Sequence, residues 1–259
     1  MSAQQVPWDG STSQQALALL EAGGSIVVVP TKVGYVIAAS DGAGLERKFQ
    51  VKDRARSKPA VVLCGSLDEL AVLARLNPEI ERFYADHWEQ DVLLGCILPW
   101  REEGLAYLPD AVCQELAMDG RGTSCFVVCF GTPAEQLATA MWDEHRAPLF
   151  ASSANPSGRG NRGVVAGIGE AIEGGVDLVI EADDYVHSIQ PAASADTRSE
   201  QGVMVSLVDT EGELVPQQHG RRGVQPAPTL IRAGLDETTI MTNLAQMFPS
   251  WNYRHGEYY

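Results

Sequence analysis

Short apolar runs rich in β-branched residues recur along the chain, and stretches of helical periodicity lie between them. The clearest run is residues 25–29, S-I-V-V-V, which is short and ends before Pro30, so it is predicted as a buried strand that opens into a loop at Thr31 and Lys32. Further strands are predicted at residues 60–64, 92–98, 124–130, 148–152, 177–180 and 203–208. Strands that alternate with helices indicate a single α/β domain around a twisted, mixed sheet flanked by helices.

Helices are predicted between these strands from apolar spacing and capping residues. Ser66 to Glu69 read S-L-D-E, a capping box that begins a helix reaching about Arg75, and Pro78 suits the first turn of the next helix. Further helices are predicted at residues 14–21, 44–51, 133–146, 164–172 and 237–247. The polar segment 183–201 lacks periodicity and is predicted as a lid or a mobile loop.

The composition indicates one large domain. The 259 residues are 45% hydrophobic and no linker divides them, so residues 1–235 are predicted as the main domain and residues 236–259 as a C-terminal helix with an aromatic tail. The formal net charge of −15 argues against direct, nonspecific binding to nucleic acid or to an anionic membrane, because such binding depends on broad cationic surfaces. A polyanion would have to bind at a local cluster of cations.

The cysteines and the N-terminus predict a cytoplasmic protein. Five cysteines in apolar surroundings favour reduced core thiols over disulfides, and Cys125 and Cys129 are expected on one face of a strand. His87, His145 and His255 are predicted as packing or surface residues, because none forms a triad with a nucleophile and an acid. The N-terminus lacks a signal-peptide pattern, and no apolar run approaches the ~18 residues of a membrane span.

The segment 51–59, V-K-D-R-A-R-S-K-P, concentrates Lys52, Arg54, Arg56 and Lys58 in an acidic chain. A lysine is a mobile point charge and an arginine is a planar fork, so their alternation suits the several oxygens of a triphosphate. Judged by spacing alone, the segment is more typical of a solvated helix end whose cations stabilise the helix dipole.

A second polar loop, residues 151–158, reads A-S-S-A-N-P-S-G and follows a predicted strand. Ser152, Ser153, Asn155 and Ser157 would place hydroxyls and an amide there, and backbone N–H groups could also face an anion. The same residue types are common in ordinary turns, so the loop by itself leaves both interpretations open.

Residues 158–163, G-R-G-N-R-G, match the dinucleotide-binding pattern G-x-G-x-x-G, and Asp177 and Glu181 follow near the position of a ribose-binding acid. The match begins several residues past the end of the predicted strand, just after Pro156, and lies in the second half of the chain. An NAD(P)-binding protein is therefore a remote alternative.

Five segments carry a family resemblance when they are taken in order. They read V-V-V-P-T-K, F-Q-V-K-D-R-A-R-S-K-P-A-V-V-L, F-A-S-S-A-N-P-S-G, V-M-V-S-L-V-D and P-T-L-I-R-A-G, and they span about residues 24–234. Together they resemble the YrdC-like family, the threonylcarbamoyl-adenylate synthases of tRNA modification and the related carbamoyl-adenylate-forming domains.

The resemblance implies a concave, positively lined cavity that binds ATP with Mg²⁺. In the implied reaction an amine captures bicarbonate, the carbamate attacks the α-phosphate, pyrophosphate leaves, and an acyl adenylate remains. Such an in-line displacement needs charge neutralisation and positioning more than a covalent nucleophile. The implied partners are ATP, bicarbonate, a small amine or amino acid, and a downstream acyl-transfer enzyme.

The resemblance also assigns site residues. Those assigned to the reacting groups are Lys52 and Arg54, from the K-x-R motif at the phosphates, and Thr31, from the first threonine of P-T-E-T near the acceptor. Those assigned to nucleotide binding are Lys58, the following basic position, Ser153 and Asn155, from S-x-N, and Arg232, from the closing R-x-G.

The sequence departs from the family at four places. P-T-E-T reads P-T-K-V at residues 30–33, and W-E-Q-D at residues 88–91 stands near the place of a missing W-P-G-P. Val127 takes the place of an arginine, and Gly202 or Val203 takes the place of a serine. These changes fall on the amino-acid and adenylate side of the implied pocket, so nucleotide binding is the firmer expectation. A lysine in P-T-K-V would favour a more anionic acceptor than threonine.

The leading hypothesis is an ATP-dependent, adenylate-forming nucleotidyltransferase whose acceptor is threonine or another amine. The alternative is a divergent protein that kept the cavity but lost turnover, and that binds a nucleotide or an RNA end.

Overall fold

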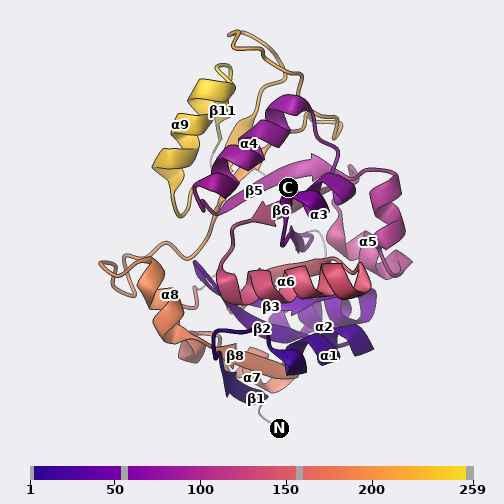
Figure 1. The fold of residues 1–259 in the computed structure, drawn as a ribbon, viewed down its shortest axis with the longest axis vertical. Coiled ribbons are helices and arrows are strands. Elements are labelled where there is room, and N and C mark those ends of the chain that lie inside the picture. The colour runs from indigo at the N-terminus through magenta and orange to yellow at the C-terminus, as the bar shows by residue number, and fades with distance from the viewer. Residues whose placement is uncertain (1–2, 54–57, 156–159, 255–259) are drawn as a thin grey trace.

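One mixed β-sheet runs through the computed structural model, which describes residues 3–53, 58–155 and 160–254 (Figure 1). In this part of the chain the sheet has 11 strands in the order β1-β8-β2-β3-β7-β4-β6-β5-β9-β10-β11. The strands are β1 Gln4–Pro7, β2 Val27–Thr31, β3 Gly34–Ala39, β4 Val61–Leu63, β5 Leu94–Pro99, β6 Thr123–Val128, β7 Leu149–Ser153, β8 Leu178–Glu181, β9 Val203–Ser206, β10 Thr229–Arg232 and β11 Asn252–Tyr253. Antiparallel pairs such as β2–β3, β3–β7 and β5–β6 alternate with parallel pairs such as β2–β8, β4–β6 and β5–β9.

Helices pack on the sheet, and most of them begin at a polar capping residue. The side chains of Ser13, Asp41, Ser66, Asn77 and Asp110 each accept a hydrogen bond from a backbone N–H of the first turn of their helix. The helices are α1 Gln14–Ala22, α2 Gly42–Lys52, α3 Leu67–Leu73, α4 Pro78–Glu89, α5 Ala111–Ala117, α6 Thr132–His145, α7 Glu170–Gly175, α8 Asp183–Ile189 and α9 Glu237–Met247, with 3₁₀ turns at Glu103–Tyr107 and Val165–Gly167.

The two faces of the sheet bury different apolar clusters. Along β2, Val28 belongs to a large cluster that includes residues of α2–α5, α7 and α9, whereas Val27 and Val29 belong to a second cluster with α1 and α6. Along β6, Phe126 joins the large cluster, while Cys125 faces a third, small cluster. The second and third clusters therefore share one face, since successive strand residues point to opposite sides. In Figure 1, α6 crosses the middle of the molecule, with β2, β3 and β8 on one side and β5 and α4 on the other.

The predicted fold class is confirmed, and the predicted helix at residues 237–247 has the same bounds as α9. The strand prediction was wrong at Pro30, which lies inside β2. Because β8 pairs with β2 only at Val27 and Val28, Pro30 lies beyond that ladder, where its missing N–H costs no sheet bond. Four strands were missed: β1, β3, β10 and β11.

Two further predictions were wrong after β7. Instead of one helix over residues 164–172, the chain makes a 3₁₀ turn and then α7, with Gly169 at φ +88° between them. Segment 183–201, predicted as a lid or a mobile loop, begins with α8, a helix that the sequence did not predict. Its later part is held by Gln190, whose side-chain amide donates to the backbone oxygen of Ser199 and accepts from its N–H, at 2.9 and 2.8 Å.

The cysteine prediction is confirmed in its main point, because all five thiols are free and buried. The prediction that Cys125 and Cys129 lie on one face of a strand was wrong. Strand β6 ends at Val128 and Cys129 has φ +53°, so the backbone turns and Cys129 joins the large cluster. His87 is a packing residue, buried with its ring 4.3 Å from the ring of Phe83. Among the described residues, no helix is long and apolar enough to cross a bilayer.

Candidate functional site

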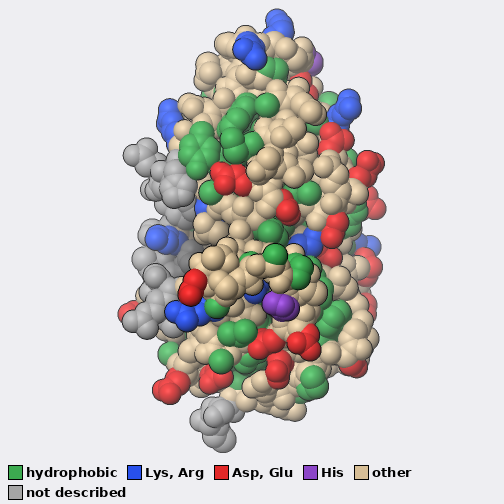
Figure 2. Space-filling model, turned by 90° about the vertical axis from the view of Figure 1, so that its left-hand side faces the viewer, with side chains coloured by type: hydrophobic (Ala, Val, Ile, Leu, Met, Phe, Trp, Pro, Cys, Tyr) green, Lys and Arg blue, Asp and Glu red, His purple; other side chains and the backbone are tan. Residues whose placement is uncertain are grey.

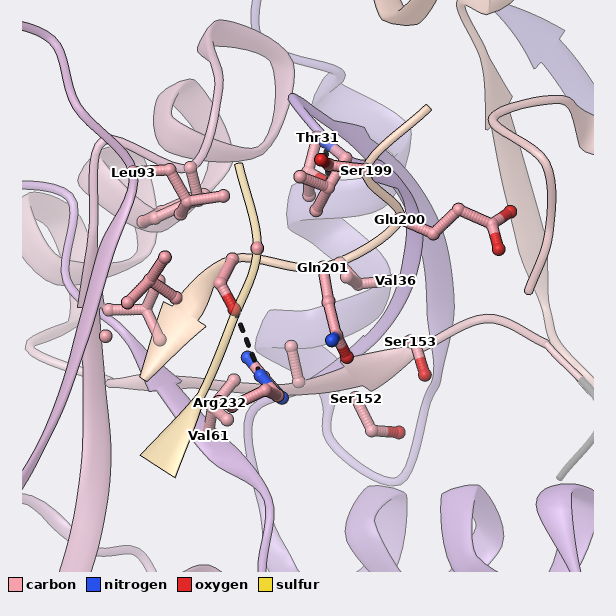
Figure 3. Close-up of a pocket in the computed structure, with 18 of the residues that line it drawn as sticks. Thr31, Val36, Val61, Leu93, Ser152, Ser153, Ser199, Glu200, Gln201 and Arg232 are labelled. Carbon is pink, nitrogen blue, oxygen red and sulfur yellow. Dashed lines mark hydrogen bonds between the residues drawn. The ribbon is translucent and has the colours of Figure 1, made fainter. Parts of the chain in front are cut away.

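A cavity of about 720 Å³ opens on the sheet face that carries the second and third clusters (Figure 3). Its walls come from the β2–β3 hairpin, from β4, β5, β6 and β9, from the end of β7, and from segments 198–203 and 232–237. This volume is in the range of pockets that enclose a small-molecule ligand, roughly 300–1,000 Å³. Elements distant in sequence therefore converge on one ligand-sized space.

The cavity has an apolar side and a polar side. Leu93 lies on one side in Figure 3, and Ser152, Ser153 and Glu200 lie on the opposite side. Leu63 and Val127 also line the cavity; β4 and β6 pair at these two residues. A ligand with a charged or polar end and an apolar end matches this division.

Lys52 is the predicted phosphate-binding cation that the structure places beside the cavity. It lies in the last turn of α2 and is only 5% exposed, so it is not a solvated helix end. Its Nζ donates to the backbone oxygen of Ser153 and to Ser153 Oγ, the latter at 3.2 Å. Because Ser153 Oγ accepts a hydrogen bond from Lys52, its own hydroxyl proton can be donated to a ligand. Arg54, its partner in the predicted K-x-R, lies outside the described residues.

Lys58 lies elsewhere. It is exposed, and it borders a different cavity together with Arg121 and Arg254 rather than the cavity of Figure 3. Arg121 there is held by Asp119, with its Nη2 2.6 Å from Asp119 Oδ2. The described cations of the basic segment thus face two different places.

The loop after β7 contributes the polar side. Ser152 borders the cavity and is 7% exposed, and its buried Oγ has no hydrogen-bond partner among the described residues. Asn155 also lines the cavity, while Ser157 lies outside the described residues. Buried Asn161 holds the loop: its Nδ2 donates to the backbone oxygens of Tyr35 and Ala154 at 3.0 and 3.3 Å.

Thr31 lines the cavity from the β2–β3 hairpin. Its Oγ1 donates to the backbone oxygen of Gly34 at 2.7 Å and accepts from the N–H of Val33 at 3.3 Å, so the hydroxyl closes the turn. Gly34 is required there, because its φ is +121° and a Cβ would lie 2.2 Å from Asn161 Oδ1. Thr31 therefore keeps an acceptor lone pair for a ligand, while its proton is used within the hairpin.

Arg232 enters the cavity from the end of β10. Its Nε donates to the backbone oxygen of Gly202 at 3.0 Å, which is drawn as the dashed line in Figure 3. The predicted site thus assembles Thr31, Ser153, Asn155 and Arg232 on one cavity, with Lys52 bonded to it through Ser153.

Six polar residues of the cavity were not predicted as site residues from the sequence: Asn161, Arg198, Ser199, Glu200, Gln201 and Glu237. Gln201 donates to the backbone oxygen of Ala233 at 3.0 Å, and Glu200 accepts from the N–H of Arg162. The signal was weak, because each of these residues lies in a polar stretch without periodicity, and only the path of the chain brings these stretches to the sheet.

Comparison with known proteins decides the family. The Sua5/YciO/YrdC family model, described as "Telomere recombination", matches residues 19–193. The chain belongs to the Sua5/YciO/YrdC family.

Three relatives illustrate the range of this family. A hypothetical protein of Streptococcus mutans UA159 is 54% identical, with a TM-score of 0.94 over the whole of both chains. A threonylcarbamoyl-AMP synthase of Pyrococcus abyssi is 26% identical over 164 residues, which is 62% of this chain and 44% of that protein. P. abyssi Sua5, solved in complex with L-threonine, has a TM-score of 0.62 at 21% identity, over 98% of this chain and 62% of that one. The chain thus spans less than half the length of the curated relative.

The sequence departure at Lys32 has a structural counterpart at Asp91. Lys32 is 5% exposed and does not line the cavity; its Nζ lies 2.5 Å from both Oδ1 and the backbone oxygen of Asp91. Its positive charge also opposes the rise in pKa that burial causes at the carboxyl groups of Glu135 and Asp236. The expectation that Lys32 attracts an anionic acceptor was therefore wrong, because its ammonium group points to carboxylates outside the cavity.

The glycine pattern at residues 158–163 does not have the context of a dinucleotide site. Strand β7 before it runs antiparallel to both neighbours, β3 and β4, and a 3₁₀ turn rather than an α-helix follows it. A dinucleotide fingerprint instead joins a strand of a parallel βαβ unit directly to a helix. The described part of the pattern does not support the NAD(P) alternative.

Proposed function

We propose that this chain is an ATP-dependent enzyme that forms a carbamoyl adenylate, of the kind named in its threonylcarbamoyl-AMP synthase relative. The nitrogen of an amine bonds to the carbon of bicarbonate, and water leaves to give a carbamate. A carbamate oxygen then bonds to the α-phosphorus of ATP as the bond to the bridging oxygen of pyrophosphate breaks. The products are an acyl adenylate and pyrophosphate.

The arrangement at the end of β7 carries this proposal. A buried ammonium group, Lys52 Nζ, is held against Ser153, which lines the cavity together with Asn155. Phosphoryl chemistry of this type depends on placed cations and hydrogen-bond donors. Lys52 and Arg54 are proposed as the phosphate-binding cations, and Ser153 and Asn155 as the residues that hold the nucleotide, with Thr31 near the acceptor. Lys58 borders another cavity and is not included.

Mg²⁺ would enter with ATP. The described residues contain no group of three or more His, Cys, Asp or Glu side chains that could hold a metal by themselves. In nucleotide sites Mg²⁺ is usually held by substrate phosphates, waters and one or two carboxylates. Glu200 lies on the polar side of the cavity, with Ser153, and would supply such a carboxylate (Figure 3).

The acyl adenylate is a reactive mixed anhydride, so a downstream acyl-transfer enzyme is the proposed partner. The face in Figure 2 shows Lys and Arg side chains dispersed among Asp and Glu rather than gathered into a broad cationic patch. Together with the net charge of −15, this supports a small-molecule substrate over a nucleic acid.

ATP–pyrophosphate exchange tests the proposal. Purified protein with ATP, Mg²⁺ and bicarbonate is expected to exchange labelled pyrophosphate when the right amino acid is supplied from a panel of twenty. Exchange should require bicarbonate, because the carbamate is the attacking group. If the protein binds ATP but exchanges no pyrophosphate with any of the amino acids, the proposal that it is an enzyme is contradicted.

One observation favours a second candidate, a nucleotide-binding protein without turnover. Val127 stands where the family has an arginine, and Lys32 stands where it has an acid and pairs with Asp91 outside the cavity, so two charged groups of the family pattern are missing. This candidate predicts that ATP or AMP raises the melting temperature although no pyrophosphate is released.

A further inference from the structure

The apolar side of the cavity is built from the sheet itself. Gly95 of β5 pairs with Val127 of β6, and Leu93 directly precedes β5. Leu93 is 3% exposed and belongs to the second cluster, against which Val127 also packs, and Val127 Cγ2 lies 3.4 Å from the position of a Cβ on Gly95. Side chains fixed on strands form a rigid apolar wall, which selects a ligand group by shape and by the absence of hydrogen-bond partners.

Gly202 keeps this side open. Its carbonyl accepts from Arg232, and a Cβ at this position would lie 3.0 Å from Leu93 Cδ2 and Cγ. A Cβ at residue 202 would therefore require Leu93 to shift by a few tenths of an ångström. Gly202 therefore contacts both parts of the site: its carbonyl binds Arg232, and its Cα lies next to Leu93 of the apolar wall.

Arg232 can bind a carboxylate there. Its Nε is used on Gly202, whereas its terminal Nη1 and Nη2 groups have no hydrogen bond or ion pair to any other described residue. A guanidinium presents such groups as a fork that matches the two oxygens of a carboxylate.

Glu237 supplies the opposite charge. It is the first residue of α9, five positions after Arg232, and it also lines the cavity. Its carboxylate has no ion pair or hydrogen bond with another described side chain, so it is available to an ammonium group. A cation, an anion and an apolar wall on one cavity match the three parts of a zwitterionic α-amino acid.

We propose that this cavity selects an α-amino acid with a branched apolar side chain, with Arg232 on its carboxylate, Glu237 on its ammonium group, and Leu93 and Val127 around its side chain. The proposal rests on the proposed function, since it names the acceptor amine of that reaction. Comparing valine with threonine tests the apolar wall directly, because the two side chains have the same shape and valine has a methyl group where threonine has a hydroxyl.

Calorimetric titration of the full chain with valine, isoleucine, threonine and serine tests this specificity. Each titration is made alone and with a non-hydrolysable analogue, α,β-methylene ATP, so that a requirement for nucleotide is seen. Valine is expected to bind tighter than threonine by about 10- to 100-fold, because the wall offers no partner to the hydroxyl. Equal or tighter binding of threonine, or no binding of any amino acid in both conditions, would overturn the proposal.

Three variants locate the contacts. Val127→Thr keeps the shape of the wall and adds a hydroxyl. The ratio of the valine affinity to the threonine affinity should therefore move toward one. Glu237→Gln should weaken valine about tenfold or more, yet leave 2-hydroxyisovalerate, which lacks the ammonium group, unchanged. Arg232→Gln should weaken both ligands. If Glu237→Gln weakened both equally, the ammonium contact would be refuted.

The outcome is separable from that of the proposed function. Selective valine binding without pyrophosphate exchange would leave the amino-acid site standing and remove the enzyme. Pyrophosphate exchange that prefers threonine would support the enzyme and remove the proposed selectivity for a branched apolar side chain.

Discussion

Lys52 is a buried cation whose charge is directed at the edge of the cavity. Replacement by Met keeps the apolar stem and removes the ammonium group from Ser153. We expect Lys52→Met to weaken ATP binding by about 10- to 100-fold, about 1.4–2.8 kcal/mol, as measured by calorimetry. Arg75→Met is the matched control, because Arg75 pairs with Glu213 and does not line the cavity. Unchanged ATP affinity in Lys52→Met would remove this residue from the site.

Glu69 gives the stability of the protein a pH dependence. Its carboxyl is 1% exposed, and burial raises its pKa to about 8, although the N–H of Gly65, 2.7 Å from Oε2, acts in the opposite direction. The nearby Asp143 carboxylate raises the pKa further. Because the folded pKa exceeds the unfolded value of 4.5, the contribution of Glu69 is fully present below pH 4.5 and is lost as the pH rises through about 8.

Glu69→Gln imitates the protonated acid, so it should flatten the fall in the free energy of unfolding between pH 5 and pH 8. Urea denaturation at four pH values measures this slope. Glu103→Gln, at an exposed position, should leave the slope as in the wild type. Parallel curves for wild type and Glu69→Gln would show that the raised pKa is incorrect.

At the scale of elements, one ion pair joins the tip of the β2–β3 hairpin to the turn after α4. Lys32 is nearly buried, whereas the side chain of Asp91 is 77% exposed, so solvent screens the pair in part. We expect Lys32→Met and Asp91→Asn each to destabilise the fold, and their double mutant to show a coupling energy of about 0.5–1 kcal/mol.

The surface pair Arg75–Glu213 provides the control cycle, because both side chains are well exposed, and its coupling should be near zero. Denaturant titration of the four proteins in each cycle measures both values. A Lys32–Asp91 coupling no larger than that of the control would show that the hairpin is held by other contacts, such as the backbone bond from Lys32 N–H to the oxygen of Phe130 at 2.8 Å.

The strands differ in how far local sequence specifies them. Val27 to Thr31 form a strand because β-branched residues fill a position buried on both faces. Strand β3 was missed because its hairpin turns at Lys32 and Val33, which are not turn formers, and the Thr31 hydroxyl makes the turn instead. Strands β1 and β11 are short edge strands that exist only through pairing with β8 and β10.

At the scale of the whole molecule, α9 is part of the main core although it comes from the segment predicted to follow the main domain. Its Ile240 and Leu244, with Phe248, belong to the same buried cluster as Phe83 of α4. Leu244→Ala should therefore cost about 2–5 kcal/mol of unfolding free energy and leave a single unfolding transition.

Gln246→Ala, on the exposed side of the same helix, should change the stability by less than about 0.5 kcal/mol. Thermal unfolding followed by circular dichroism compares the two variants. A separate early transition in Leu244→Ala would show that residues 236–259 unfold as an independent unit. The predicted boundary at residue 235 would then separate two units that unfold independently.

The sequence by itself determined the α/β class, most strands and helices, the thiol core and the family, because these depend on local periodicity, capping and motifs that remain readable in one dimension. Tertiary structure alone decided what each site residue faces. Lys52 turns to Ser153, Lys58 borders another cavity, and Lys32 points away to Asp91, although all three are cations of motif-like segments. The physical reason is that the direction of a side chain is set by the register of its strand or helix against distant neighbours. The convergence of Arg232, Glu237 and Val127 on one cavity depends on that packing.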